Sequence, residues 1–147
     1  IRGLVGSEMC IRDRKKIEDS GIRPTKQRRI LAKLIFEKGD RHISAENLFD
    51  EVKNEDRKIS MATIYNTLKQ FTSLGLIREI VVDQNKSLYC NNNKSHYHLY
   101  IEDEGKIHDI PTKNINLDIP SIPACLSLHN IDVIVRVRSL KEDPKKN

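Results

Sequence analysis

The residues whose types and spacing could best bind a metal or support a reaction are two histidines, His96 and His98, in the segment from His96 to Glu102. Alternate residues of a β-strand point to the same side, so this segment would present both imidazoles on one face and Tyr97 on the other. Two imidazoles on one strand provide half of a metal site. The alternative is an ordinary pair of histidines whose hydrogen bonds are satisfied at the surface or in the core.

Further metal ligands would have to come from neighbouring elements. The turn Asp103–Lys106 returns the chain along a second strand, which contains Asp109, and His42 precedes a predicted helix in the other half of the chain. A metal bound by His42 together with the strand residues would connect the two halves. The remaining histidines, His108 and His129, have no such spacing, and we expect both to be exposed.

The segment Ser60–Leu74 predicts a helix with two different faces. Apolar residues recur at helical spacing along one face: Met61, Ile64, Leu68 and Phe71. Small or hydrogen-bonding residues dominate the remaining surface: Ala62, Thr63, Tyr65, Asn66 and Lys69. Ser60 is suited to cap the helix and Gly75 to end it. Such a helix fits a DNA major groove, although a simple amphipathic helix with a solvated face would have the same pattern.

Two helices precede this segment and a hairpin follows it. The first is capped by Thr25 and ends at Gly39, and the second spans His42–Val52 with Ser44 as its cap. After Gly75 the pattern becomes extended over Leu76–Val82 and Ser87–Cys90, separated by turn-forming residues. Helices with apolar stripes followed at once by a hairpin indicate a winged helix-turn-helix.

We therefore predict an α+β protein, with an N-terminal winged helix-turn-helix followed by a small α/β dimerisation domain. The strongest strand signal, Ile131–Arg138, falls in the second domain, whose apolar face would be hard to cover without a second copy. The expected divisions are residues 1–14 as a non-native or disordered segment, 15–90 as the winged-helix DNA-binding domain, 91–95 as the hinge, 96–140 as the dimerisation and sensing domain, and 141–147 as a disordered tail.

Charge and cysteine content narrow the function classes. Of the formal net charge of +5, the basic surplus lies in the N-terminal half: residues 15–78 contain 14 Lys and Arg against 9 Asp and Glu, whereas residues 83–147 contain 9 of each. This asymmetry favours nucleic acid as a partner of the first half.

The 3 cysteines are far apart and form neither a disulfide framework nor a Cys-x-x-Cys pair. This cysteine usage makes a reducing cytoplasm the expected location. The sequence also has no apolar run long enough to span a membrane.

Several motifs together resemble the ferric uptake regulator family. They are Gly21–Arg28, His42–Leu48 with its His-x-Ser-Ala-Glu element, and Ala62–Leu68 followed by Gly75-Leu76. Within that family, three stretches are most similar to the iron response regulator branch: Tyr65–Phe71, Arg78–Asp83 and Ile131–Arg138.

The resemblance implies a dimeric winged-helix regulator that binds double-stranded DNA. It implies that Tyr65 contacts bases and that Asn66 replaces an arginine common in relatives, so operator preference would differ. Positions expected to meet the DNA backbone or minor groove are Arg23, Thr25, Arg28, Ser60 and Thr63.

The resemblance also implies a regulatory metal site formed by His42, His96, His98 and Asp109. A fifth family position is Cys90 here, either a soft ligand or a small strand residue. A structural thiolate zinc site is not expected, because the corresponding cysteines are Ile101 and Glu104. In the iron response branch haem binds a histidine-rich segment like Ser95–His98, which makes haem a second candidate ligand.

We therefore expect a sequence-specific transcriptional regulator of iron homeostasis that responds to haem or to a divalent metal (zinc, iron or manganese). We expect it to bind an operator as a homodimer, with no role at a membrane. The first alternative is a manganese, zinc or peroxide-stress sensor of the same family. The second is a metal-dependent enzyme using His96 and His98, which the lack of a positioned nucleophile or general base disfavours. We predict that the chain is not an enzyme.

Overall fold

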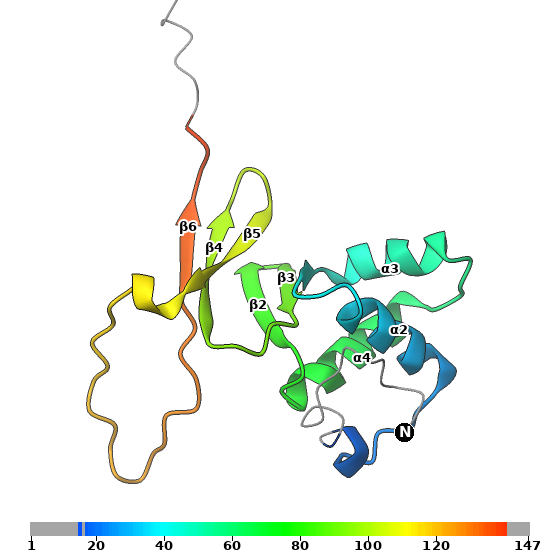
Figure 1. Ribbon diagram of the computed structural model, residues 1–147, viewed down its shortest axis with the longest axis horizontal. Coiled ribbons are helices and arrows are strands. Elements are labelled where there is room, and N and C mark those ends of the chain that lie inside the picture. The colour runs from blue at the N-terminus through cyan, green and yellow to red at the C-terminus, as the bar shows by residue number, and fades with distance from the viewer. Residues whose placement is uncertain (1–14, 16, 141–147) are drawn as a thin grey trace, which may run out of the picture. The chain divides into compact units, whose positions relative to one another are not determined.

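The computed structural model describes residue 15 and residues 17–140. The segments expected to be non-native or disordered, 1–14 and 141–147, lie outside the described residues. The chain divides into two compact units, residues 1–93 and 94–147 (Figure 1). This boundary falls inside the segment 91–95 that was expected to be a hinge.

Three helices form the body of the first unit: α2 (Lys26–Phe36), α3 (Ala45–Asn54) and α4 (Met61–Ser73). Each begins at a residue with an extended backbone whose hydroxyl accepts a hydrogen bond from a main-chain N–H three residues later, which satisfies a donor that the helix itself leaves unpaired. These caps are Thr25, Ser44 and Ser60, as the sequence indicated. A short helical turn, Ile17–Asp19, precedes them and ends near Gly21, whose φ of 70° lies in the left-handed region that glycine adopts without strain.

The apolar stripes of the helices meet in one core. Leu31 of α2, Leu48 of α3, and Ile64, Leu68 and Phe71 of α4 are all 0% exposed. Full burial of such a side chain stabilises the fold by about 1.5–3 kcal/mol. Because this face of α4 is buried in the core, its opposite face is left for other contacts.

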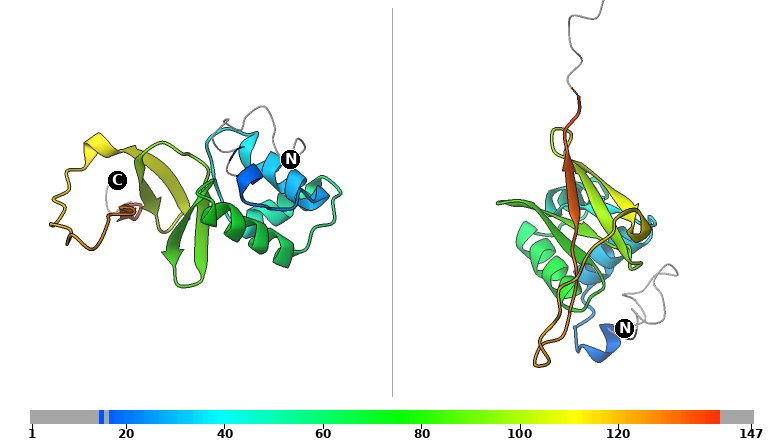
Figure 2. Two further views of the ribbon diagram at one scale, coloured as in Figure 1. Left: turned by 90° about the horizontal axis from the view of Figure 1, so that it is seen from below. Right: turned by 90° about the vertical axis from the view of Figure 1, so that its left-hand side faces the viewer.

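A three-stranded antiparallel sheet completes the first unit, in the order β1-β3-β2. The hairpin joins β2 (Arg78–Asp83) to β3 (Lys86–Cys90), and it follows α4 as a wing (Figure 2). The third strand, β1 (His42–Ile43), pairs with β3. The sequence interpretation assigned the segment His42–Val52 to the second helix with Ser44 as its cap. The cap is confirmed, whereas the strand formed by His42 and Ile43 was not predicted. The cap residue Ser44 requires an extended backbone, so α3 begins only at Ala45.

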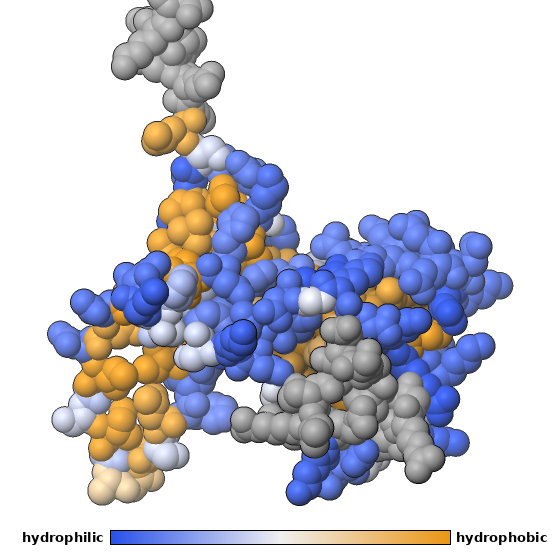
Figure 3. Space-filling view, in the orientation of Figure 1, coloured by the Kyte–Doolittle hydropathy of each residue, from blue (hydrophilic) through white to orange (hydrophobic). Residues whose placement is uncertain are grey.

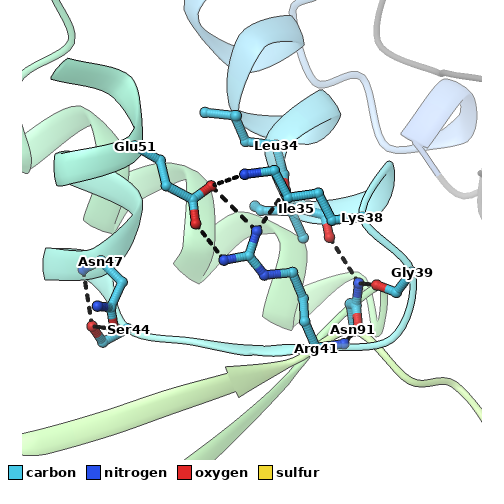
Figure 4. A network of polar contacts seen from close by, with 9 residues as sticks. All are labelled: Leu34, Ile35, Lys38, Gly39, Arg41, Ser44, Asn47, Glu51 and Asn91. Atoms are coloured by element: carbon cyan, nitrogen blue, oxygen red, sulfur yellow. Dashed lines mark hydrogen bonds and ion pairs between the residues drawn. The ribbon is translucent and has the colours of Figure 1, made fainter. Parts of the chain in front are cut away.

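A polar network connects the end of α2, β1, α3 and the end of β3 (Figure 4). The Arg41 guanidinium forms a bidentate pair with the Glu51 carboxylate, which Lys38 also contacts at 2.9 Å. The Asn91 side chain donates to the carbonyls of Ile35 and Gly39 at 2.7 and 2.8 Å and accepts from the Arg41 N–H at 2.7 Å. The loop between α2 and β1 is therefore fixed on two sides.

The second unit is built on a three-stranded sheet in the order β5-β4-β6. The central strand β4 (His96–Ile101) is antiparallel to β5 (Lys106–Pro111) and parallel to β6 (Ile134–Val137). The strand β6 is shorter than the predicted Ile131–Arg138. Among the described residues of this unit, the one helical element is the short 3-10 helix η1 (Thr112–Asn114). The predicted α+β class is confirmed.

A long loop, residues 115–133, joins η1 to β6 and extends away from the sheet (Figure 2). Its apolar side chains are exposed to solvent and form a hydrophobic surface (Figure 3). They are Leu117, Ile119, Ile122, Leu126 and Leu128, between 40% and 64% exposed. None of the helices among residues 15 and 17–140 is long and apolar enough to cross a membrane.

Candidate metal centre and nucleic-acid interface

The centre of the second unit brings together two imidazoles and a carboxylate. His96 and His98 lie on the same face of β4, with their side chains buried and their Nε2 atoms 2.9 Å apart. Asp109 is the β5 residue directly opposite His98 in the antiparallel register. Its Oδ1 atom lies 3.4 Å from Nε2 of His96 and 3.7 Å from Nε2 of His98. The strand register therefore accounts for the grouping of all three side chains.

A main-chain contact sets the tautomer of His96. Its Nδ1 atom lies 2.6 Å from the carbonyl oxygen of Lys94. A carbonyl oxygen can only accept, so Nδ1 must donate its hydrogen. In the neutral ring, Nε2 then has a lone pair facing His98 and Asp109. Such a contact from the second ring nitrogen is what orients a metal-ligating histidine.

The spacing of these three groups fits a small cation. Ligand atoms about 2.0–2.1 Å from a tetrahedral ion lie roughly 3.3 Å from one another, close to the observed separations of 2.9, 3.4 and 3.7 Å. Two imidazoles with one carboxylate suit iron, manganese or zinc. The group can therefore contribute three ligands to a divalent metal.

The other residues considered as ligands belong to the first unit. His42 is half-buried on β1, and its cross-strand partner on β3 is Cys90, which is 1% exposed. Facing residues of an antiparallel pair have their side chains close together. The structure thus pairs His42 with Cys90, and it groups His96 and His98 with Asp109. As expected, His108 and His129 are exposed.

The exposed face of α4 contains the residues expected to meet DNA. Ala62, Tyr65, Asn66 and Lys69 are exposed, and Tyr65 is 46% accessible. At the beginning of the helix, the Ser60 hydroxyl accepts from the Thr63 N–H at 3.2 Å, and the two hydroxyls lie 3.0 Å apart. The helix therefore presents its first turns to solvent with a well-defined cap.

The start of α2 presents a second group of expected DNA contacts. Thr25 caps the helix by accepting from the Arg28 N–H at 3.2 Å. The Arg28 guanidinium donates to the carbonyl oxygen of Arg23 at 2.7 Å. Arg23 itself is exposed and Arg28 partly so. The Arg28 guanidinium is thus held near the beginning of α2, and Arg23 lies just before it in the sequence.

Sequence reasoning missed the partner of Tyr65. Its hydroxyl donates to Oε1 of Glu46, the second residue of α3, at 2.9 Å. This hydrogen bond raises the pKa of Tyr65, and slight burial adds to the effect. The pKa of Glu46 is lowered, first by a hydrogen bond from its own main-chain N–H and then by Tyr65. The sequence contained no local signal for this pair, because its members lie 19 residues apart.

A winged helix-turn-helix unit followed by a small domain with a two-histidine, one-carboxylate group defines a class: metal-responsive DNA-binding regulators. The model of the ferric uptake regulator family matches residues 19–135, and the chain belongs to that family. It is a transcription regulator rather than an enzyme, and it binds DNA as a homodimer.

Individual relatives agree with this assignment. The peroxide-responsive repressor PerR of Staphylococcus aureus (strain Mu50 / ATCC 700699) is 30% identical over 100 residues, which cover 68% of this chain and 67% of that protein. The ferric uptake regulator of Francisella tularensis with iron has a TM-score of 0.66 at 22% identity, covering 81% of this chain and 92% of that one. The Pseudomonas aeruginosa regulator with manganese has a TM-score of 0.65 at 21% identity, covering 88% and 98%. At these identities the two structures support the fold.

Proposed function

We propose that this protein regulates genes of iron homeostasis, binding its operator through α4 when a divalent metal occupies a site formed by His42, His96, His98 and Asp109. The observation that supports it most is the grouping of two buried imidazoles and one carboxylate on β4 and β5. We place the protein in the iron response regulator branch and in the cytoplasm, where it would meet operator DNA.

On the DNA side, we propose that Tyr65 contacts bases in the major groove and that Asn66 reads an adjacent position. An asparagine side chain can pair with adenine, whereas the arginine common in relatives would favour guanine. Ser60 and Thr63 would contact the DNA backbone. Arg23, Thr25 and Arg28, at the start of α2, would contact the backbone or the minor groove and fix the register. The two copies in a dimer would read two half-sites one helical turn apart.

On the sensing side, we propose His42 as the ligand from the first unit. A metal bound by residues of both units would fix the angle between them and thereby favour dimers that fit the operator. Cys90, opposite His42, would be a small strand residue rather than a fifth ligand, because a carboxylate-containing site favours harder cations than thiolate does.

For dimerisation, we propose the apolar loop 115–133 as part of the interface. Its exposed leucines and isoleucines form the hydrophobic surface described above. A second copy covering this surface would remove their side chains from water.

The test is operator affinity as a function of added metal, with a duplex selected from random sequence by the metal-loaded protein. Iron(II), manganese(II) and zinc(II) are titrated separately, and affinity is followed by fluorescence anisotropy. Alanine at both His96 and His98 should remove the metal dependence. Alanine at both His108 and His129 is the matched control and should retain it. Operator affinity that ignores all three cations would refute the proposal.

Haem is the other ligand to test, by the Soret absorbance on titration. Both imidazoles are nearly inaccessible, with His96 6% and His98 3% exposed. This burial favours a small ion over a wide macrocycle at this position. A Soret shift lost on alanine substitution of both residues would instead assign haem as the effector.

The second candidate function is peroxide sensing, which the similarity to a peroxide-responsive repressor favours. Iron(II) reacts with hydrogen peroxide and manganese(II) does so far less readily. A peroxide sensor should therefore lose operator binding on peroxide treatment when loaded with iron and retain it when loaded with manganese. Operator binding by the iron-loaded protein that survived this treatment would exclude peroxide sensing.

A further inference from the structure

The first unit contains a pocket open to solvent, called the cavity below, that none of the expected DNA-contacting residues lines. Its volume is about 310 Å³, and it lies between the first turn of α2 and the loop that connects α3 to α4. Lys26 lines one side, and Arg57 and Lys58 line the other. Three cationic side chains from two separate parts of the sequence thus line one cavity.

The loop that presents Arg57 and Lys58 has a defined backbone. Asp56 adopts a φ of 53°, in the left-handed region, and its N–H donates to the carbonyl of Lys53 at 3.0 Å. The Arg57 N–H donates to the carbonyl of Val52 at 3.1 Å. These bonds end α3 and turn the chain back, so the backbone that carries the two cationic side chains has a defined position.

The cavity has a surplus of positive charge. Three cations line it against one acid, Asp56. Arg57 also forms an ion pair with Glu55, whose carboxylate lies 3.5 Å from the Arg57 Nε atom. Within residues 15 and 17–140, Lys26 and Lys58 form no ion pair. A site of this composition selects an anion, and a phosphate group suits two lysines beside an arginine.

The position of the cavity next to α4 indicates where the anion would come from. Lys58 lies two residues before the cap of α4, Ser60. Two extended residues span at most about 7 Å, whereas the major groove is about 12 Å wide. With the first turns of α4 in the groove, this cavity would lie over a strand bordering it.

We infer that this cavity binds a backbone phosphate of duplex DNA beside the groove that α4 enters. The inference rests on the proposed use of α4 for DNA binding. The volume equals that of roughly ten water molecules at about 30 Å³ each, which leaves room for a phosphodiester and its remaining hydration. Lys26, Arg57 and Lys58 would therefore add affinity and register without reading sequence.

The experiment compares two double variants of the whole 147-residue chain on the selected duplex. Lys26→Gln with Lys58→Gln alters the cavity. Lys33→Gln with Lys53→Gln removes the same charge elsewhere on α2 and α3, and unfolding curves should show that both variants remain folded. Affinity is measured over a series of salt concentrations. The logarithm of the binding constant falls as the logarithm of the salt concentration rises. Removal of one interaction with a phosphate should reduce the magnitude of this negative slope by about 0.9. A dimer has one such cavity in each of its two copies.

The cavity variant should therefore show a slope lower by roughly 2 and about tenfold weaker binding at moderate salt, while the control should remain near wild type. Equal slopes for the two variants would overturn the inference. If wild type selects no duplex at all, the proposed DNA recognition fails instead, whatever the variants do.

A second measurement identifies the source of the phosphate. Single neutral methylphosphonate linkages are placed at successive positions of the duplex. One position in each half-site should weaken wild type but leave the cavity variant unaffected, because that variant no longer binds the phosphate at this position. Inorganic phosphate is then titrated while amide spectra of Lys26 and Lys58 are recorded. Saturable binding of free phosphate without any such position in DNA would overturn the assignment to a backbone phosphate.

Discussion

The hydroxyl of Tyr65 and the carboxylate of Glu46, 2.9 Å apart, connect the exposed face of α4 to the first turn of α3. The hydrogen bond holds the phenol ring of the proposed base-reading residue in one orientation. It also places a negative charge next to a surface that would face phosphates. Glu46 should therefore favour specific binding and oppose non-specific binding.

Substitution of Glu46 should separate these two effects. Glu46→Ala frees the phenol, so specific affinity should fall about threefold to tenfold, the usual contribution of one hydrogen bond, while non-specific affinity rises slightly. Glu46→Gln retains an acceptor and loses the charge, so both affinities should rise together. Competition binding with selected and scrambled duplexes measures the ratio. An unchanged ratio in Glu46→Ala would show that Tyr65 needs no support from Glu46.

The ion pairs of Glu51 predict a pH dependence of stability. Although burial opposes it, contacts with Arg41 and Lys38 lower the pKa of Glu51 from its ordinary value of 4.5. A carboxyl group with a depressed pKa stabilises the fold above its unfolded-state pKa, and this stability is lost as the pH falls through the lower, folded-state value. Glu51→Gln should therefore cost about 2 kcal/mol near neutral pH and much less well below pH 4.5. Urea unfolding at the two pH values measures the difference.

The control for Glu51 is Glu55→Gln, because Glu55 pairs with Arg57 at the surface, where both side chains are more than 40% exposed. Such pairs contribute about 0–1 kcal/mol. A Glu51 variant that lost no more stability than the Glu55 variant would show that the partly buried Arg41–Glu51 pair does not stabilise the fold.

Asn91 should contribute more to stability than a typical polar side chain. Its amide makes three hydrogen bonds to main-chain groups at Ile35, Gly39 and Arg41. Asn91→Ala leaves these groups without their partner, so we expect a loss of about 2–3 kcal/mol in the free energy of unfolding. Asn85→Ala, at the exposed turn of the hairpin, should change stability by less than about 0.5 kcal/mol. A loss of that small size at Asn91 would mean that water replaces its contacts.

The apolar loop of the second unit should affect the dimer rather than the fold. Leu126 and Leu128 are 64% and 52% exposed in the single chain. Serine at both positions should weaken dimerisation at least tenfold, because each leucine contributes about 1.5–3 kcal/mol when fully buried. Analytical ultracentrifugation over a range of protein concentrations measures the equilibrium. Leu140→Ser is the control at a residue that is 96% exposed, and equal behaviour of the two variants would exclude this loop from the interface.

The elements that could be predicted are those whose signals are local. Ser44 and Ser60 cap helices through bonds to residues three positions on, and the spacing of apolar residues along α4 matches its buried side. The pairing of His96 with His98 follows from strand alternation alone. For this reason the winged-helix unit and the histidine pair are apparent in the sequence.

The features that escaped prediction depend on distant partners. The strand β1 forms because its two residues pair with the edge of β3, which lies nearly fifty positions later in the sequence. Ile17 is 0% exposed in the core, but one apolar residue in a polar stretch has no periodicity to reveal it. The hydrogen bond between Asn91 and Arg41 joins residues 50 positions apart. The cavity likewise forms between α2 and the loop before α4, which no local pattern indicates.

The position of β1 directly before α3 places two proposed functional residues close together in the first unit. His42 is paired with Cys90 on β3, and only four positions separate it from Glu46, the residue that holds the Tyr65 phenol. A shift of the His42 ring on binding a cation would therefore be only four residues away from the side chain that orients Tyr65. Metal binding at His42 and base reading by Tyr65 would then be coupled within the first unit alone.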